Sequence, residues 1–194
     1  RMITGEGWLP DGDTCALTVI KVSNYNHQTS YTPPIAPSPN LPNQRAIRLY
    51  PSLCFFEGTP VSVGRGTDYP FQVLGRPAFE QGNFTFTPRP IAGKAANPPY
   101  EGQQCHGFDL RADGKQDNLQ ASHLIYRWLI AFYQAAEDKE AFFRPYFTKL
   151  AGTPELQQLI EQGATPKAIR QTWQPELEAF QTIRKQYLLY PDFK

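Results

Sequence analysis

Prolines and glycines are crowded into the first part of this 194-residue chain, and their distribution limits what that part can fold into. Fourteen of the 19 prolines and 11 of the 14 glycines precede residue 108. Proline interrupts helices and sheet interiors, and glycine marks turns. We therefore expect loops and short strands over residues 1–110, and helices over residues 111–194, where apolar residues recur at helical spacing.

Short alternating segments in the first part predict a small, mostly antiparallel sheet. The expected strands lie at residues 16–22, 71–74, 84–88 and 104–110. Residues 31–43 contain five prolines and are expected to form an extended loop, since proline excludes both helix and ladder. Residues 46–56 are apolar but contain Pro51, so the pattern leaves their type open.

The second part has the apolar spacing of amphipathic helices, and its aromatic stripes are interpreted as core packing. Helices are expected over residues 119–137 and 142–150, and two more after Thr153 and Thr165, each of which precedes a proline. A break is expected at Pro175. The predicted fold is α+β: a small antiparallel sheet with long loops packed against a helical second half, in one domain over residues 1–194.

Composition and charge exclude several classes of function. Nineteen basic and 18 acidic residues give a formal charge of +1, which argues against a nucleic-acid-binding domain. No apolar run is long enough to span a membrane. The histidines and the three cysteines (Cys15, Cys54 and Cys105) lack metal-ligand spacing, so no metal or cofactor is expected and the cysteines are predicted to be buried free thiols. Because the chain starts with Arg1, we expect it to be a piece of a longer protein.

A glycine-flanked arginine is the most informative local motif. Gly64 and Gly66 flank Arg65, so the backbone can approach a ligand closely while the guanidinium binds an anion. Thr67 follows directly and offers a hydroxyl. The alternative is a tight turn in which Arg65 forms a structural pair with Glu57.

Two further polar segments are candidate ligand contacts. Ser38 and Asn40 lie between prolines, which would hold their polar groups rigidly toward a ligand such as a sugar; the alternative is a covering loop. Tyr25 and His27 follow the predicted strand at 16–22 and could line the same ligand cleft as Ser38 and Asn40. A lone histidine at such a position is more often structural.

These loops make the sequence recognisable. It resembles the C-terminal domain of the NamZ family, the exo-β-N-acetylmuramidases, over essentially the whole chain. The matching segments are residues 5–9, 25–29, 37–42, 49–52, 56–59, 64–67, 70–71, 86–88, 105–107 and 187–191. Residues 25–28 and 187–191 look most like members from Bacteroidetes-type bacteria.

The resemblance implies half of a peptidoglycan-degrading glycoside hydrolase that releases N-acetylmuramic acid from the non-reducing end of cell-wall fragments. The family joins this domain to a Rossmann-like N-terminal domain that is missing here, and the site lies in the cleft between the two. The main catalytic carboxylate is then expected in the missing domain, and this chain alone is expected to be inactive. The implied location is periplasmic or extracellular, and the implied partners are the sugar and the missing domain.

Roles for the loop residues follow from this resemblance. Glycoside hydrolysis usually needs two carboxylates, and Glu57 is either one of them or the residue that holds Arg65. An arginine can bind the lactyl carboxylate of N-acetylmuramic acid through two parallel hydrogen bonds. We assign Arg65 this role, with Thr67, Ser38 and Asn40 as hydrogen-bonding neighbours. The alternative function is a stand-alone, non-catalytic carbohydrate- or peptidoglycan-binding module.

Overall fold

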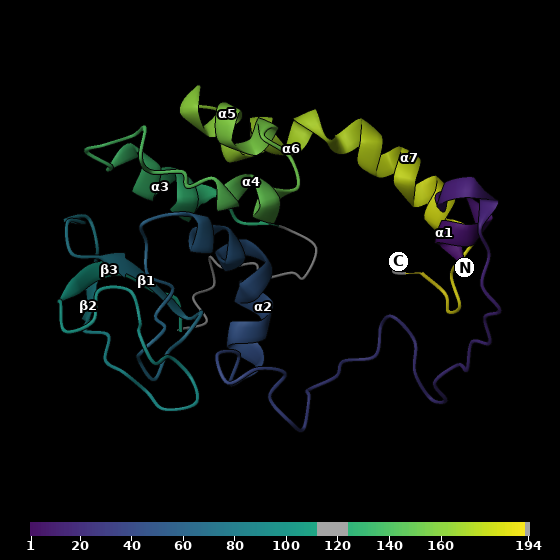
Figure 1. Ribbon diagram of the computed structural model, residues 1–194, viewed down its shortest axis with the longest axis horizontal. Coiled ribbons are helices and arrows are strands. Elements are labelled where there is room, and N and C mark those ends of the chain that lie inside the picture. The colour runs from purple at the N-terminus through teal and green to yellow at the C-terminus, as the bar shows by residue number, and fades with distance from the viewer. Residues whose placement is uncertain (112–123, 193–194) are drawn as a thin grey trace. The chain divides into compact units, whose positions relative to one another are not determined.

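The computed structural model describes residues 1–111 and 124–192, which form two compact units (Figure 1). One unit combines Arg1–Tyr31 with Arg170–Lys194, and the other spans Thr32–Ile169. The helical elements are α1 (Met2–Gly5), η1 (Pro10–Gly12), α2 (Gln44–Leu53), η2 (Cys54–Gly58), α3 (Arg127–Gln134), α4 (Tyr146–Ala151), α5 (Glu155–Glu161), α6 (Pro166–Thr172) and α7 (Gln174–Lys185). None of these helices is long and apolar enough to span a membrane.

A three-stranded antiparallel sheet lies in the larger unit, which confirms the expected α+β fold. Its strands are β1 (Val73–Arg76), β2 (Phe84–Phe86) and β3 (Cys105–Asp109), in the order β1-β3-β2. The prediction is correct for β2 and β3. Strand β1 begins two residues later than predicted. Phe71 has a φ of 54°, and the Gln72 N–H donates to the Tyr69 carbonyl and closes a turn there.

The predicted strand at residues 16–22 is wrong. These residues run as irregular chain, and Ile20 and Val22 leave 89% and 63% of their surface exposed. The Val22 N–H donates to the Tyr190 hydroxyl at 2.7 Å rather than to a neighbouring strand. An alternating pattern therefore records β propensity here, but propensity alone does not supply a pairing partner.

The apolar segment whose type was open forms α2 followed by the short helix η2. Asn43 begins α2 by accepting a hydrogen bond from the Ala46 N–H at 3.0 Å. Leu49 and Leu53 are completely buried on one face, while Pro51 lies near the end of α2. The proline-rich stretch before α2 is an extended loop, as predicted, with one isolated bridge between Ser38 and Leu41.

An aromatic cluster joins the sheet to the helices of the larger unit. Phe132 of α3 contacts Phe108 of β3, with ring centroids 5.6 Å apart, and Phe79 at 4.1 Å. It also meets Phe56 of η2 at 5.8 Å. Phe142 and Phe143 precede α4, and their rings meet each other in a T-shaped contact with centroids 4.9 Å apart. The interpretation of these aromatic residues as core packing is confirmed for this unit.

The helix boundaries depart from the periodic pattern in two places. The helix expected over 119–137 is α3, which starts only at Arg127, and its first five predicted residues lie outside the described residues. The Ile125 N–H donates instead to the Ser52 hydroxyl at 3.0 Å. The helix expected over 142–150 begins after Pro145, which serves as the N-cap of α4.

The later helices start beside the two threonines, but the expected cap holds only for α6, since Pro154 is itself the N-cap of α5. The Thr153 hydroxyl accepts the Glu155 N–H at 3.3 Å, and the Thr165 hydroxyl accepts the Ala168 N–H at 3.2 Å. The expected break lies directly before α7, whose first turn contains Pro175. The interpretation of apolar stripes as core packing is wrong for α7, where no residue is buried and Phe180 is 42% exposed, although Ile169 of α6 is buried.

The smaller unit is organised around Tyr187. The Tyr187 hydroxyl donates to the Glu6 carboxylate at 2.5 Å, and a Cβ at Gly5 would lie 2.5 Å from that hydroxyl oxygen. Figure 1 shows α1 beside the end of α7 accordingly. The predicted burial of the cysteines is confirmed for Cys105 but wrong for Cys15, which lies exposed in irregular chain.

Candidate functional site

The glycine-flanked arginine adopts the turn that its sequence predicts. Gly64 and Gly66 have φ values of 79° and 82°, which side chains rarely adopt. A Cβ at Gly64 would also lie 2.8 Å from the Tyr69 carbonyl oxygen. Only glycine fits both constraints, and the turn projects Arg65 between the two glycines.

The Arg65 guanidinium is held from two directions. Its Nη2 lies 2.7 Å from a carboxylate oxygen of Glu57, with both side chains about one-third exposed. Its central carbon lies 5.1 Å from the centre of the Phe71 ring, within cation–π range. The structural pair that was the alternative reading of this motif therefore exists, and it leaves part of the guanidinium accessible.

Arg65 opens onto a pocket of about 360 Å³ in the larger unit. Its wall combines the chain from Phe56 to Arg65 with Tyr100 and Arg144, which come from two distant segments. We call it the arginine pocket, after its four ionisable lining residues: Glu57, Arg65, Tyr100 and Arg144. With two arginines and one carboxylate, the pocket carries a net positive charge and is suited to an anionic ligand.

Tyr100 is fixed in an uncommon backbone conformation at the pocket wall. Its φ is 59°, and its hydroxyl donates to the Pro60 carbonyl at 2.5 Å. Burial raises the pKa of Tyr100, and the positive charges of Arg76 and Arg144 partly offset that rise. The hydroxyl therefore stays protonated at neutral pH and closes the wall as a neutral group.

Sequence reasoning missed Arg144. It precedes α4 and belongs to a segment that helical periodicity marks only as core packing. Its backbone N–H donates to the Gly58 carbonyl at 2.9 Å, which brings it beside the chain that carries Glu57. No local motif signals this contact, because it joins residues 86 positions apart.

The remaining polar residues predicted for this unit contact backbone groups. The Thr67 hydroxyl donates to the Gly64 carbonyl at 2.7 Å and accepts the Tyr69 N–H at 3.0 Å, so it shapes the turn. Asn40 is largely buried and donates to the Lys94 carbonyl at 3.0 Å, while the Ser38 hydroxyl accepts the Asn40 N–H. Their role as sugar contacts stays a prediction.

Tyr25 and His27 belong to the smaller unit. The Tyr25 ring meets Tyr190 edge-on at 5.4 Å, and His27 Nδ1 lies 3.9 Å from a carboxylate oxygen of Asp192. The matching segments near the two ends of the chain thus contact each other. Whether Tyr25 and His27 contact substrate stays a prediction.

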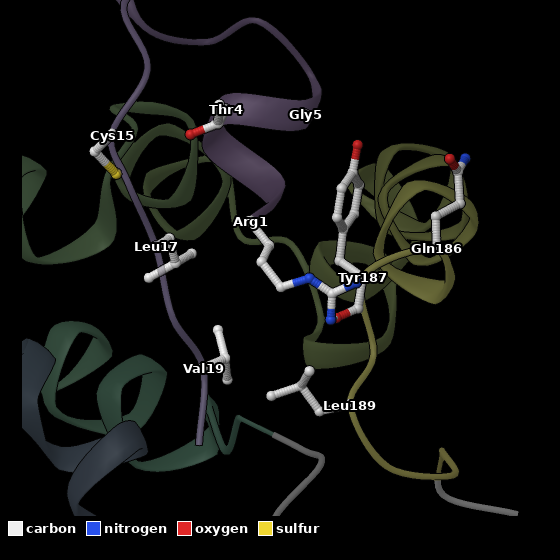
Figure 2. A pocket seen from close by; sticks show the side chains of 9 residues that line it. All are labelled: Arg1, Thr4, Gly5, Cys15, Leu17, Val19, Gln186, Tyr187 and Leu189. Carbon is white, nitrogen blue, oxygen red and sulfur yellow. The ribbon is translucent and has the colours of Figure 1, made fainter. Parts of the chain in front are cut away.

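A second pocket, of about 620 Å³, lies in the smaller unit (Figure 2). Figure 2 shows Leu17 and Val19 on one side and Tyr187 and Leu189 on the other, with Arg1 between them. The hydrogen bond to Glu6 raises the pKa of Tyr187. This lining contains one arginine, Arg1, whereas two arginines line the arginine pocket and offer more hydrogen-bond donors to an anionic ligand.

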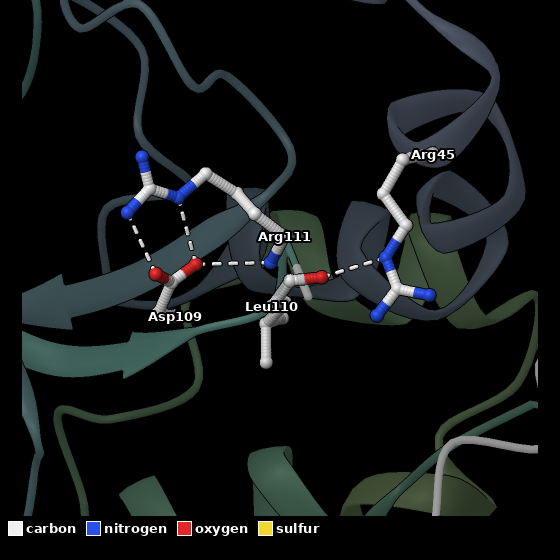
Figure 3. A network of polar contacts seen from close by, with 4 residues as sticks. All are labelled: Arg45, Asp109, Leu110 and Arg111. Carbon is white, nitrogen blue, oxygen red and sulfur yellow. Dashed lines mark hydrogen bonds and ion pairs between the residues drawn. The ribbon is translucent and has the colours of Figure 1, made fainter. Parts of the chain in front are cut away.

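A separate ion pair, between Asp109 and Arg111, stabilises the end of β3 (Figure 3). Asp109 accepts two hydrogen bonds from the Arg111 guanidinium, at 2.9 and 2.7 Å, and these bonds lower the pKa of the Asp109 carboxyl. Arg111 also covers the Tyr69 ring at 3.9 Å, and Arg45 donates to the Leu110 carbonyl at 2.6 Å. Asp109 and Arg111 bind each other and Arg45 binds the backbone between them, so we interpret the cluster as structural. Within residues 1–111 and 124–192, no group of three acidic, histidine or cysteine side chains is placed to hold a metal.

Comparison with known proteins identifies the family. The family model described as the C-terminal part of the exo-β-N-acetylmuramidase NamZ matches residues 48–190. The chain belongs to the NamZ family. Membership confirms the resemblance that the loop motifs indicate, and the match contains both the Glu57–Arg65 pair and Arg144.

Relatives and solved structures agree with this membership. The chain is 28% identical over 190 residues to the peptidoglycan β-N-acetylmuramidase NamZ of Bacillus subtilis, covering 90% of this chain and 45% of that protein. A DUF1343 family protein of Bacteroides fragilis is 46% identical, with a TM-score of 0.92 over 99% of this chain. A second one from that organism shares the fold at 19% identity, with a TM-score of 0.72 over 98% of this chain. The chain spans about half the length of these relatives, 54% for each Bacteroides protein.

Proposed function

We propose that this chain is the substrate-binding half of a glycosidase that removes N-acetylmuramic acid from the non-reducing end of peptidoglycan fragments. Family membership is the observation that carries the proposal, because a relative in the family is named a peptidoglycan β-N-acetylmuramidase. The net positive arginine pocket supports it, since N-acetylmuramic acid differs from N-acetylglucosamine by an acidic lactyl group. The working site is completed by a further domain of the longer protein, which acts outside the cytoplasm.

Arg65 binds the lactyl carboxylate in this proposal. Its planar guanidinium can donate two parallel hydrogen bonds to a carboxylate, a geometry that a lysine ammonium cannot reproduce. The two glycines give the turn its positive φ values, and Arg65, whose side chain is partly accessible, lines the pocket.

Glu57 holds Arg65 rather than acting as a catalytic carboxylate. Its oxygen already accepts a hydrogen bond from the guanidinium at 2.7 Å, and the pair presents one pre-oriented arginine edge to the ligand. Burial and the negative charge of Glu57 raise the pKa of the neighbouring Tyr50 and Cys54, so the carboxylate lies among groups that stay neutral. The carboxylates that perform hydrolysis are then supplied mainly by the rest of the protein.

The test replaces Arg65 by lysine in the full-length protein. Arg65→Lys keeps the charge but loses the two-bond fork, so kcat/KM for a chromogenic N-acetylmuramic acid glycoside should fall roughly tenfold. The matching N-acetylglucosamine glycoside lacks the lactyl group, and its slower hydrolysis should change little.

Arg89→Lys is the matched control, because Arg89 is exposed and meets Asp68 only at 4.0 Å. It should leave both substrates unaffected. Equal losses on the two substrates in Arg65→Lys would contradict the assignment of Arg65. A full-length protein that binds the sugars but hydrolyses neither would favour the non-catalytic binding module.

A further inference from the structure

The charges in the arginine pocket do not balance when they are assigned to pairs. Arg65 is matched by Glu57 at 2.7 Å, which leaves Arg144 as the excess cation among the lining residues. Within residues 1–111 and 124–192, no carboxylate lies within ion-pair distance of Arg144. A ligand with a single negative charge would therefore neutralise the pocket.

The backbone of Arg144 is fixed on both sides. Phe142 and Phe143 directly before it are 0% and 8% exposed and stack within the aromatic cluster. Its N–H donates to the Gly58 carbonyl, and a Cβ at Gly58 would lie 2.6 Å from the Cα of Phe147. This close packing holds Arg144 at the pocket edge, while its exposed side chain keeps the freedom to meet a ligand.

Arg144 lines the same pocket as Arg65, and its side chain is also exposed to solvent. Both line the pocket of about 360 Å³ together with Tyr100. The positive charge of Arg144 acts to lower the pKa of the Tyr100 hydroxyl. That hydroxyl donates a hydrogen bond to the Pro60 carbonyl, on the same wall as Arg65. A pocket of this size can hold one sugar ring with its substituents, and both arginines line it.

We propose that Arg144 is a specificity-determining residue that binds the carboxylate of an acidic sugar together with Arg65. The inference rests on the proposed function, which supplies the sugar, and adds a residue that no sequence motif indicates. Arg65 is oriented by Glu57 and supplies directional hydrogen bonds. Arg144 supplies the unbalanced charge that makes an acidic sugar bind better than a neutral one.

Binding of free sugars to the full-length protein tests this role without requiring hydrolysis. Titration calorimetry with N-acetylmuramic acid and with N-acetylglucosamine gives an affinity ratio for each variant. Arg144→Gln should weaken the binding of N-acetylmuramic acid about tenfold, which is the low end of the effect of losing a hydrogen bond to a charged group. The affinity for N-acetylglucosamine should stay unchanged. Arg144→Lys keeps the charge and should recover part of the loss.

The control is Arg48→Gln, an exposed arginine of α2 that does not line the pocket, and its ratio should equal that of the unmodified protein. An unchanged ratio in Arg144→Gln, with the ratio lowered in Arg65→Lys, would overturn the role of Arg144 alone. Equal binding of the two sugars by the unmodified protein would overturn both this inference and the proposed function. Thermal unfolding of each variant confirms that it is folded.

Discussion

Arg65 is held in its turn by residues that lie close to it in the sequence. The glycines around Arg65 have the positive φ values that their sequence predicts, and Glu57 reaches Arg65 as the alternative reading anticipated. These residues lie within a short stretch, so their spacing alone limits their geometry. Arg144 joins them only through tertiary packing, and its sequence neighbours Phe142 and Phe143 carry no signal of a binding site.

The Asp109–Arg111 pair gives a prediction about pH at the residue scale. Hydrogen bonds from Arg111 hold the folded-state pKa of Asp109 below its ordinary value of 3.8, so the folded state favours the ionised carboxylate. The pair therefore stabilises the fold above pH 3.8, and that stability is lost as the pH falls through the lower folded-state pKa.

Asp109→Asn should lower the free energy of unfolding by about 1 kcal/mol at pH 7, since the pair is partly exposed. The difference from the unmodified protein should shrink steadily below pH 3.8. Urea unfolding at a series of pH values measures both. Asp68→Asn is the control, because Asp68 is 73% exposed and should show neither effect. A stability difference that stays constant with pH would contradict the assignment.

At the scale of elements, local signals succeeded where a single residue type decides the outcome. Threonine–proline pairs marked the starts of α5 and α6, and Pro145 explains the late start of α4. Periodicity failed where a strand depends on a pairing partner. Residues 16–22 have the alternating pattern but pair with no strand among the described residues. The segment containing Pro51 became a helix because Asn43 caps it and Leu49 and Leu53 bury its face.

The contact between η2 and α4 gives a prediction at this scale. Gly58→Ala would place a methyl group 2.6 Å from the Cα of Phe147, and the backbone must move to admit it. We expect a loss of about 2 kcal/mol in unfolding free energy, typical of overpacking. Because Gly58 also accepts the Arg144 N–H, the preference for N-acetylmuramic acid over N-acetylglucosamine should fall as well.

Urea unfolding and sugar titration measure the two effects of Gly58→Ala. Gly152→Ala is the comparison, since Gly152 has a φ of 74° but no neighbour within 4 Å of an added Cβ. Gly152→Ala should lower the free energy of unfolding by about 1 kcal/mol through backbone strain. The preference for N-acetylmuramic acid over N-acetylglucosamine should not change. A Gly58→Ala protein with unchanged stability would show that the two elements are not tightly packed.

At the scale of the whole molecule, the chain matches about half the length of its relatives. It spans 45% of the Bacillus relative and 54% of each Bacteroides protein, and its larger unit contains the arginine pocket. Family membership was predictable from the loop motifs, because their glycines, prolines and charged residues are constrained by geometry. The helices were less informative, since many sequences satisfy the same apolar spacing.

We propose that this chain binds the acidic sugar while hydrolysis needs the rest of the protein. The most direct measurement compares hydrolysis of a chromogenic N-acetylmuramic acid glycoside by the full-length protein and by residues 1–194 alone, with the fold of the latter checked by circular dichroism. We expect activity in the full-length protein and none in the folded chain. Hydrolysis by the chain alone would contradict this proposal and would make Glu57 the first carboxylate to replace.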